Sequence, residues 1–328
     1  MAGSTRGSVF VTGGSGFIGH HLVERLRDRG DEVTVFDVAP PQGGGHEGVR
    51  YVEGDLRDGA ALGRAAQGAD MIYHLAAVVG VDQYLARPLD VIDINLSGTR
   101  NVLEAARNTG ARLVLSSTSE VFGKNPAVPW AEDSDRVLGP TSLDRWSYSS
   151  SKALAEHVTF AFARQFGLEA TIVRYFNVYG PRQRPAYVVS RSVHRAVNGL
   201  SLVVYDEGRQ TRCFTYVDDA VEGTIRAGDH DDAVGEVFNI GSMVETTVGE
   251  AVRRIAELTG SEVVVQVDTA EKLGASYQDL SRRVPDNAKA GRVLGWHPTT
   301  SLHDGLSRTV EWARASSWWL SMPDKGAA

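Results

Sequence analysis

The chain has 328 residues, of which 42% are hydrophobic and 23% are charged, a balance typical of a globular protein large enough for two domains. Its 34 Lys and Arg against 41 Asp and Glu give a net charge of −7 without a basic block, which argues against a nucleic-acid-binding surface. The single cysteine, Cys213, excludes an internal disulfide, and no apolar run approaches the ~20 residues needed to span a bilayer. We therefore expect a cytoplasmic protein.

The first expected element is a short strand at Val9–Val11, followed at once by a glycine-rich turn. Glycines at 13, 16 and 19 are spaced G-x-x-G-x-x-G, and apolar residues then recur at helical spacing through residue 26. In such a unit Gly13 permits the tight turn, Gly16 lets the main chain approach a pyrophosphate, and Gly19 lets helix and strand pack closely. The helix N-terminus then faces the phosphates with its amides and its positive dipole end.

A second strand, Val33–Phe36, ends in Asp37, which lies 18 residues past Gly19. A carboxylate at this point accepts hydrogen bonds from the adenosine ribose of a dinucleotide. Its charge would repel a 2′-phosphate, and no Arg or Lys follows it through Gln42. The sequence therefore predicts NAD rather than NADP as the cofactor.

Strands and helices continue to alternate after this point. Met71–His74 and Arg112–Leu115 are predicted as buried strands, and Leu89–Arg107 as one long amphipathic helix that carries Asn95. His74 is interpreted as a packed histidine rather than a catalyst. The alternation predicts an α/β fold with a Rossmann-type, doubly wound parallel sheet and ligands at the carboxyl ends of its strands.

The domain organisation follows from the same pattern. We expect an NAD-binding Rossmann domain over residues 1–175, to which a later segment of about 205–235 returns. Residues 176–328 are expected to form a smaller C-terminal α/β domain that binds the substrate.

Tyr148 and Lys152 are four residues apart in an expected helix and so lie on one face of it, one turn apart. An ammonium group at this distance favours the phenolate and lowers the pKa of the tyrosine below its free value near ~10. Such a base can take a proton from a sugar hydroxyl while a hydride leaves the same carbon. Taken alone, the pair fits a solvated helix face better, so the interpretation depends on the rest of the chain.

The order of these segments resembles extended short-chain dehydrogenase/reductases, in the nucleotide-sugar epimerase/dehydratase branch. The matching motifs are Thr12–Gly19, Asp55-Leu56, His74–Ala77, Ser116–Gly123 and Tyr148–Lys152. The resemblance implies a Ser/Thr–Tyr–Lys triad with Thr118 as its hydroxyl member, although Ser117 and Ser119 compete for that role. It also implies that Lys152 holds the nicotinamide ribose. Further contacts to NAD are implied for Phe17, Ile18, Asp55, Leu56, Leu75, Ala76, Ala77, Asn95 and Tyr175.

The C-terminal half carries motifs that the same resemblance assigns to the substrate. Asn177 matches the family asparagine that reaches the nucleotide diphosphate, and Arg212 matches the arginine that binds it. Many members carry Asp where this chain has Cys213. Arg283 is implied as a second diphosphate or ribose ligand, oriented by Asp286.

The residues after Thr118 bear on the type of reaction. A 4,6-dehydratase usually has an Asp-Glu pair there to eliminate water, whereas this chain has Ser119-Glu120, so dehydration is not expected. The Thr-Ser-Glu triplet also occurs in UDP-glucuronate decarboxylases, where the Glu assists loss of the carboxylate. A structural and a catalytic role for Glu120 have equal weight at this point.

The run Gly180–Pro185 resembles UDP-glucuronic acid 4-epimerases, in which its second arginine, here Arg184, binds the sugar carboxylate. Oxidising C4 of a uronic acid creates a β-keto acid, which loses carbon dioxide when its carboxylate bond aligns with the carbonyl π system. An arginine that holds the carboxylate out of that alignment permits epimerisation. These epimerases often carry Thr where this chain has Asn177.

We therefore expect an NAD-dependent isomerase, a UDP-sugar 4-epimerase that interconverts UDP-glucuronic acid and UDP-galacturonic acid. A UDP-glucuronate decarboxylase that forms UDP-xylose is the first alternative, and a UDP-glucose 4-epimerase the next. A non-catalytic NAD-binding scaffold is disfavoured because the chain keeps Thr118, Tyr148 and Lys152. The resemblance also implies a homodimer, and we expect no metal ion, nucleic acid or membrane partner.

Overall fold

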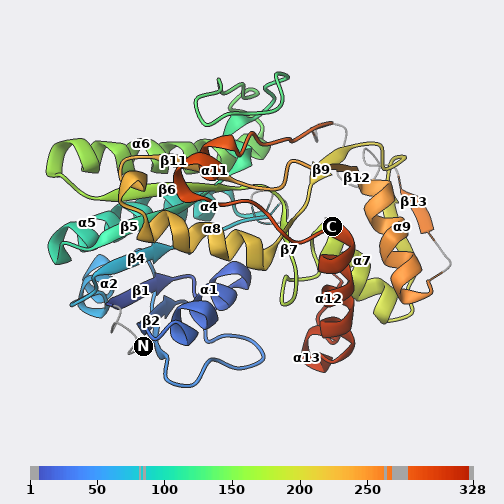
Figure 1. Cartoon of the computed structure of the whole chain (residues 1–328), viewed down its shortest axis with the longest axis horizontal. Coiled ribbons are helices and arrows are strands. Elements are labelled where there is room, and N and C mark those ends of the chain that lie inside the picture. Colours follow the sequence, from blue (N-terminus) through green and yellow to red (C-terminus); the bar gives the residue numbers. More distant parts are fainter. Residues whose placement is uncertain (1–6, 81–82, 84–85, 262–263, 268–279, 325–328) are drawn as a thin grey trace.

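A computed structural model describes residues 7–80, 83, 86–261, 264–267 and 280–324. Seven parallel strands form one sheet in the order β11-β6-β5-β4-β1-β2-β3 (Figure 1). The strands are β1 (Ser8–Thr12), β2 (Glu32–Asp37), β3 (Arg50–Glu53), β4 (Met71–His74), β5 (Arg112–Thr118), β6 (Ala170–Tyr175) and β11 (Val237–Ile240). This confirms the predicted Rossmann-type, doubly wound sheet.

The strands are apolar because both faces of the sheet are covered. In β1, Val9 and Val11 pack into one hydrophobic cluster, whereas Phe10 packs into another on the opposite face. Side chains in a strand alternate between the two faces, so this short run supplies both layers. Each of the three side chains is at most 2% exposed.

Helices cover both faces (Figure 1). One layer consists of α1 (Phe17–Asp28), α8 (Val217–Asp229) and α11 (Ala288–Leu294). The other consists of α2 (Gly59–Ala65), α4 (Pro88–Asp93), α5 (Thr99–Thr109) and the long helix α6 (Ser147–Phe166).

The predicted helix Leu89–Arg107 is not one regular α-helix. A π-turn, η1 (Ile94–Gly98), separates α4 from α5 and contains Asn95. The amide of Asn95 accepts a hydrogen bond from the main chain N–H of Val78 at 2.9 Å and also donates to the Val78 carbonyl. A wider turn of this kind is often found near functional sites, and here it turns Asn95 onto the loop after β4.

The elements of the C-terminal half that lie outside the main sheet and its helix layers form the right-hand side of Figure 1. The helices of this part are α7 (Val188–Val197), α9 (Val248–Thr259), α12 (Leu302–Arg314) and α13 (Ser317–Leu320). Its strands pair as β7 (Val178–Tyr179) with β10 (Thr215–Tyr216), β8 (Leu202–Tyr205) with β13 (Val264–Val267), and β9 (Thr211–Cys213) with β12 (Glu245–Thr247). Residues 217–240 return to the main sheet as α8 and β11, slightly further along the chain than the expected 205–235.

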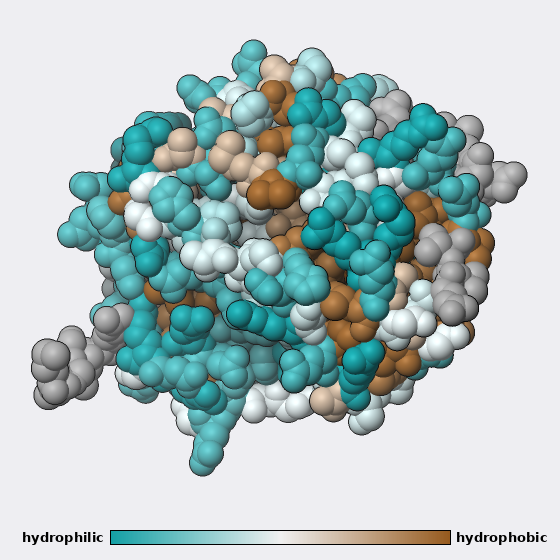
Figure 2. All heavy atoms as spheres, turned by 45° about the vertical axis from the view of Figure 1, so that its right-hand side comes forward, coloured by the Kyte–Doolittle hydropathy of each residue, from teal (hydrophilic) through white to brown (hydrophobic). Residues whose placement is uncertain are grey.

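The surface around this half is mixed in character. Figure 2 shows hydrophilic side chains over most of one face, with hydrophobic ones gathered in patches toward its right-hand side. Within the described residues, no helix has the length and apolar character that crossing a membrane requires.

Candidate active site

A cleft of about 860 Å³ runs along the edge of the sheet where the parallel strands end. This volume is in the range of small-molecule sites, about 300–1,000 Å³. Every predicted site residue except Asn95 lines the cleft. Residues from both halves of the chain therefore meet in one hollow, although they are widely separated in the sequence.

The glycine turn between β1 and α1 allows a close approach of main chain to the cleft. Gly13 has φ +73°, and a Cβ added there would lie 2.5 Å from the Ala76 nitrogen. A Cβ on Gly19 would collide with the carbonyl oxygen of Gly13 and would lie 2.8 Å from the Gly14 Cα atom. Both glycines are thus required by geometry, and the helix N-terminus they expose suits a pyrophosphate.

Asp37 ends β2 and faces this turn. Its carboxylate accepts hydrogen bonds from the main chain N–H groups of Ser15, at 3.0 Å, and Val38, at 2.8 Å. Burial raises the pKa of the carboxyl group above its ordinary value, while these amides act in the opposite direction. A fixed acceptor beside a phosphate-binding turn suits an adenosine ribose, as expected for NAD.

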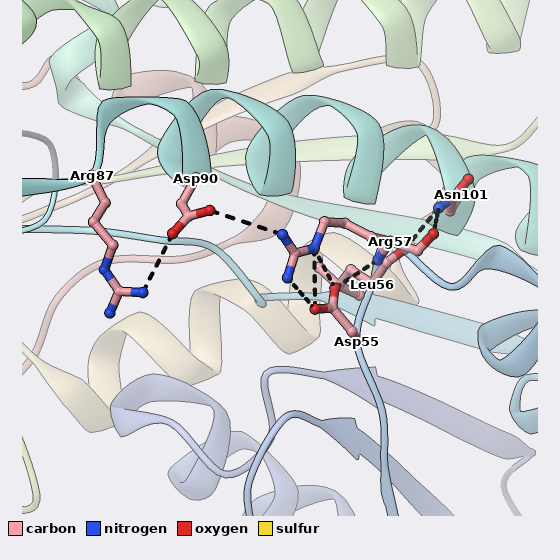
Figure 3. A network of polar contacts seen from close by, with 6 residues as sticks. All are labelled: Asp55, Leu56, Arg57, Arg87, Asp90 and Asn101. Carbon is pink, nitrogen blue, oxygen red and sulfur yellow. Dashed lines mark hydrogen bonds and ion pairs between the residues drawn. The ribbon is translucent and has the colours of Figure 1, made fainter.

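Asp55 and Leu56 lie in the loop after β3, within the network of polar contacts drawn in Figure 3. Arg57 contacts both oxygens of Asp55, with Nε at 3.0 and 3.1 Å, and its other end lies 3.9 Å from Asp90. Asn101 donates to the Leu56 carbonyl at 2.8 Å. The loop is therefore held from two sides, and the Asp55 carboxylate is shared with a guanidinium that sequence analysis did not consider.

His74 is packed in the interior, as predicted. Its Nδ1 lies 2.6 Å from the Thr12 hydroxyl and its Nε2 3.0 Å from the Thr99 hydroxyl. Burial lowers the pKa of the imidazole to about 3, with a smaller contribution from Lys152. A neutral ring between two hydroxyls holds strand β4 against its neighbours.

Asn95 lies behind the cleft wall rather than on it. It is 1% exposed, and besides Val78 it contacts the hydroxyl of Ser151 on α6 at 3.3 Å. Its polar atoms thus connect the loop after β4 to the helix that carries Tyr148. These contacts indicate that Asn95 positions the loop after β4 at the cleft wall, whereas a direct contact of Asn95 to NAD stays a prediction.

Thr118, Tyr148 and Lys152 meet at the centre of the cleft, and the hydroxyl groups of Thr118 and Tyr148 interact by a hydrogen bond. Burial raises the pKa of the Tyr148 phenol, and the nearby carboxylate of Glu120 raises it further. Burial also lowers the pKa of Lys152 to about 8, although the carboxylate of Glu156 opposes this.

The pKa of Tyr148 is therefore raised in this structure, whereas the spacing of Tyr148 and Lys152 predicts a lowered one. Burial of the phenol is the largest cause of this shift, because removing a phenolate from water is costly. The effect of Lys152 itself stays a prediction.

Glu120 lies beside this triad between two arginines. Its Oε2 is 2.7 Å from Arg145, and its Oε1 forms an ion pair with Arg283. Burial alone would raise the pKa of the Glu120 carboxyl group, but the two guanidinium groups hold it at about 2. The carboxylate is thus ionised, and Arg283 pairs with it rather than with Asp286, which instead accepts a hydrogen bond from the main chain of Ala288.

Arg145 was missed by the sequence analysis. It lies in the short 3₁₀ turn η3 (Asp144–Trp146) directly before α6, and its side chain is only 6% exposed. Its guanidinium carbon lies 5.3 Å from the centre of the Trp146 ring. Arg145 lies three residues before Tyr148, and no periodic pattern in the surrounding sequence distinguishes it from a solvent-exposed arginine.

The remaining predicted substrate ligands lie further along the same cleft. Asn177 has φ +40°, and its Nδ2 is buried without a hydrogen-bond partner among the described residues. Arg212 donates to the carbonyl groups of Thr211 and Leu280 at 2.7 and 2.9 Å. A strained residue with an unused donor facing a cleft suits an anionic ligand.

Two predicted residues of the cleft wall, Arg184 and Tyr175, form polar contacts with other protein groups. Arg184 donates to the Val79 carbonyl at 3.1 Å, and its guanidinium lies over the Tyr187 ring at 5.4 Å. The Tyr175 hydroxyl is 2.7 Å from the Thr224 hydroxyl, so the cleft receives the ring of Tyr175 rather than its polar end.

The two halves of the chain also touch at the cleft wall, where Gln42, Arg182 and Trp318 are lining residues. Arg182 donates to the Gln42 carbonyl in the loop after β2, and its guanidinium lies 5.1 Å from the centre of the Trp318 ring. Gly43 packs so closely on Trp318 that an added Cβ would lie 2.6 Å from the ring. We call this contact of Gln42, Gly43, Arg182 and Trp318 the strap.

The chain matches the model of the NAD dependent epimerase/dehydratase family over residues 9–241. It is 39% identical to a UDP-N-acetyl-alpha-D-glucosaminuronate decarboxylase of Bacillus cytotoxicus, over 93% of this chain and 97% of the relative. It is 34% identical to UDP-glucuronic acid decarboxylase 1 of Xenopus tropicalis, over 94% of this chain and 72% of the relative.

Solved structures give a similar range of reactions. The fold matches UDP-glucose 4-epimerase of Thermotoga maritima with UDP-glucose at a TM-score of 0.84 and 31% identity, over 94% of this chain and 99% of that one. It matches MoeE5 in complex with UDP-glucuronic acid and NAD at a TM-score of 0.84 and 32% identity, with the same coverage. Relatives at this level include both decarboxylases and epimerases.

Proposed function

Because this chain belongs to the NAD-dependent epimerase/dehydratase family and uses NAD, we propose that it decarboxylates a UDP-linked uronic acid after transient oxidation at C4. The observation that carries the proposal is the ionised Glu120, held between Arg145 and Arg283 beside Thr118 and Tyr148. This proposal reverses the order of the two reactions expected from the sequence, where 4-epimerisation came first.

The residues at the centre of the cleft account for the oxidation. Tyr148 takes the proton of the sugar 4-hydroxyl, Thr118 holds that oxygen by a hydrogen bond, and Lys152 orients the nicotinamide ribose. NAD, when bound, would supply the acceptor for the C4 hydride and the source of the hydride for the final reduction. The glycine turn and Asp37 hold the dinucleotide in place.

The keto group at C4 places the C6 carboxylate β to a carbonyl. The C5–C6 bond can then break, so that carbon dioxide leaves and the electron pair moves into an enolate whose oxygen lies at C4, near Thr118 and Tyr148. C5 takes up a proton from solvent to give the 4-keto pentose, and the product forms when C4 regains a hydride and Tyr148 returns the proton to O4. Glu120, Arg145 and Arg283 together carry one net positive charge beside Thr118 and Tyr148, so this cluster attracts the C6 carboxylate to the position next to the carbon that is oxidised.

A second candidate is 4-epimerisation of the same uronate, and the presence of Arg184 on the cleft wall favours it. The contacts of Arg184 to Val79 and Tyr187 support ranking it second, because a clamp on the sugar carboxylate would have to give up part of them.

Product analysis tests the proposal. Purified protein with NAD is incubated with UDP-glucuronic acid, UDP-N-acetylglucosaminuronic acid or UDP-glucose, and the nucleotide sugars are separated. We expect a UDP-pentose and carbon dioxide from at least one uronate. A uronate inverted at C4 without carbon dioxide would support epimerisation instead, and turnover of UDP-glucose alone would exclude both uronate reactions.

We also propose a homodimer formed through α4 and α6. Leu89 is 73% exposed and Leu154 is 46% exposed, although the two helices that carry them pack side by side. A second copy of this chain would cover both side chains. Light scattering on Leu154→Glu should show a shift to monomer, whereas Val244→Glu, at a position 70% exposed in the C-terminal half, should leave the mass unchanged.

A further inference from the structure

Arg145 is a buried charge that the reaction steps above do not require. Its side chain is 6% exposed, and it lies between Glu120 and the ring of Trp146. Removing a guanidinium from water is costly, and a buried ion pair is often no more stabilising than a well-packed apolar pair. A contribution to stability is therefore a weak reason for an arginine at this position.

Glu120 contacts Arg145 and Arg283 through different oxygen atoms. The carboxylate thus bridges the two guanidinium groups. The two planar guanidinium groups therefore lie on either side of one carboxylate. Each guanidinium carries five N–H donors. The same spacing suits a second carboxylate, which would be bound from the open side of the cleft.

The position of the cluster relative to the triad indicates which carboxylate this is. Arg145 precedes Tyr148 by three residues, and the Glu120 charge affects the pKa of the Tyr148 phenol. Tyr148 acts at C4 in the proposed function, so a carboxylate on the neighbouring C5 of the sugar ring lies within reach of these arginines. Asn177 and Arg212, the residues expected at the diphosphate, line the same cleft.

We infer that Arg145 is a specificity-determining residue for the substrate, which binds the C6 carboxylate of the uronate together with Arg283. The inference rests on the proposed function for the identity of the sugar. It replaces Arg184 as the expected carboxylate ligand. A substrate with a neutral C6 gains no binding affinity from Arg145. The C6 carboxylate of a uronate loses its hydrogen bonds to water but gains a charge-assisted hydrogen bond from the guanidinium.

Calorimetric binding tests this inference without turnover. The background is Tyr148→Phe with NAD bound, and the ligands are UDP-glucuronic acid, UDP-glucose and UDP, which carry the same diphosphate. Arg145→Met should weaken binding of UDP-glucuronic acid at least tenfold and change the affinities for UDP-glucose and UDP less than twofold. Arg145→Lys keeps the positive charge but loses the paired N–H donors of the guanidinium. This variant should therefore retain part of the preference for UDP-glucuronic acid over UDP-glucose that Arg145→Met loses.

The matched control is Arg282→Met. Arg282 is adjacent to Arg283 in the sequence, pairs with Glu245 and is 55% exposed, and it is not part of the cleft wall. This change should leave all three affinities within twofold. If Arg145→Met does not fold, as judged by its thermal unfolding, Arg145→Lys and Arg145→Gln carry the same comparison.

Equal weakening of all three ligands would overturn the inference and assign Arg145 a structural or diphosphate-binding role. An unchanged preference for the uronate would also overturn it. These outcomes differ from failure of the proposed function, because a protein that binds uronates through Arg145 but releases no carbon dioxide would retain the inference and lose the decarboxylation.

Discussion

The two ends of the cleft are built in different ways. The cofactor end consists of main chain and glycines close together in sequence, with Gly13, Gly19 and Asp37 within one strand–helix–strand unit. The sugar end depends on charged side chains from distant segments, since Glu120 and Arg283 are 163 residues apart. The cofactor end is thus a property of a local motif, whereas the sugar end exists only in the folded chain.

The largest effect is expected where the two ends meet. Tyr148→Phe removes the hydroxyl that exchanges the proton, so kcat should fall about 10²–10⁴-fold. Affinities for NAD and for UDP-sugar should stay within about twofold, because neither end depends on that proton. Steady-state turnover and calorimetry measure both. A kcat within tenfold of the original would assign the base to another residue.

Gly19→Ala tests the local character of the cofactor end. The added Cβ meets the Gly13 carbonyl and the Gly14 Cα, so the turn must shift, and NAD affinity should fall about 10–100-fold with little change in UDP affinity. Gly63→Ala in α2 is the control, because a Cβ there meets nothing within 4 Å and favours the helix by up to ~1 kcal/mol. If Gly19→Ala weakened the affinities for NAD and for UDP equally, the two ends of the cleft would not be independent.

Glu120→Gln tests how strongly the sugar end depends on charge. The pKa of Glu120 is lowered to about 2, so its contribution to the free energy of unfolding is complete above its ordinary value of 4.5 and is lost as the pH falls toward 2. The variant should lose about 2–4 kcal/mol at pH 7 because two buried guanidinium groups lose their counterion. This difference from the original chain should shrink below pH 4.

The matched control for that measurement is Glu245→Gln. The carboxyl group of Glu245 also has a pKa lowered to about 2, chiefly by a hydrogen bond from Arg282. Its partner is 55% exposed, so solvent screens the pair, and the loss should stay below about 1 kcal/mol. Denaturant unfolding from pH 2 to pH 7 measures both variants. Equal losses would contradict the distinction between the buried and the exposed pair.

The smallest effect is expected at Arg57. It orients the Asp55 carboxylate at the cofactor end, but its side chain is 50% exposed. Exposed ion pairs contribute little, so Arg57→Ala should weaken NAD binding only about twofold to fivefold. Fluorescence titration with NAD measures the change. A loss above fiftyfold would show that the cofactor end also depends on charged side chains.

The same difference explains what the sequence could predict. Strand alternation, the glycine spacing and Asp37 are local patterns, and the sheet and the NAD cofactor followed from them. Arg145 has no such pattern, and its contact with Glu120 depends on how the turn before α6 meets the end of β5. Burial raises the pKa of the Tyr148 phenol, and this effect could not be predicted from the spacing of Tyr148 and Lys152.

The strap gives the cleft a further property. In the proposed reaction the sugar is oxidised and then reduced again, so NAD ends each cycle in its oxidised form. Turnover therefore does not require NAD to dissociate. Arg182 and Trp318 connect the C-terminal half to the loop that follows Asp37, and both line the cleft. NAD would then behave as a resident group, and activity would not depend on the ratio of oxidised to reduced dinucleotide in the surroundings. Trp318→Ala should release NAD during gel filtration that the unchanged chain retains; equal retention by both would contradict this.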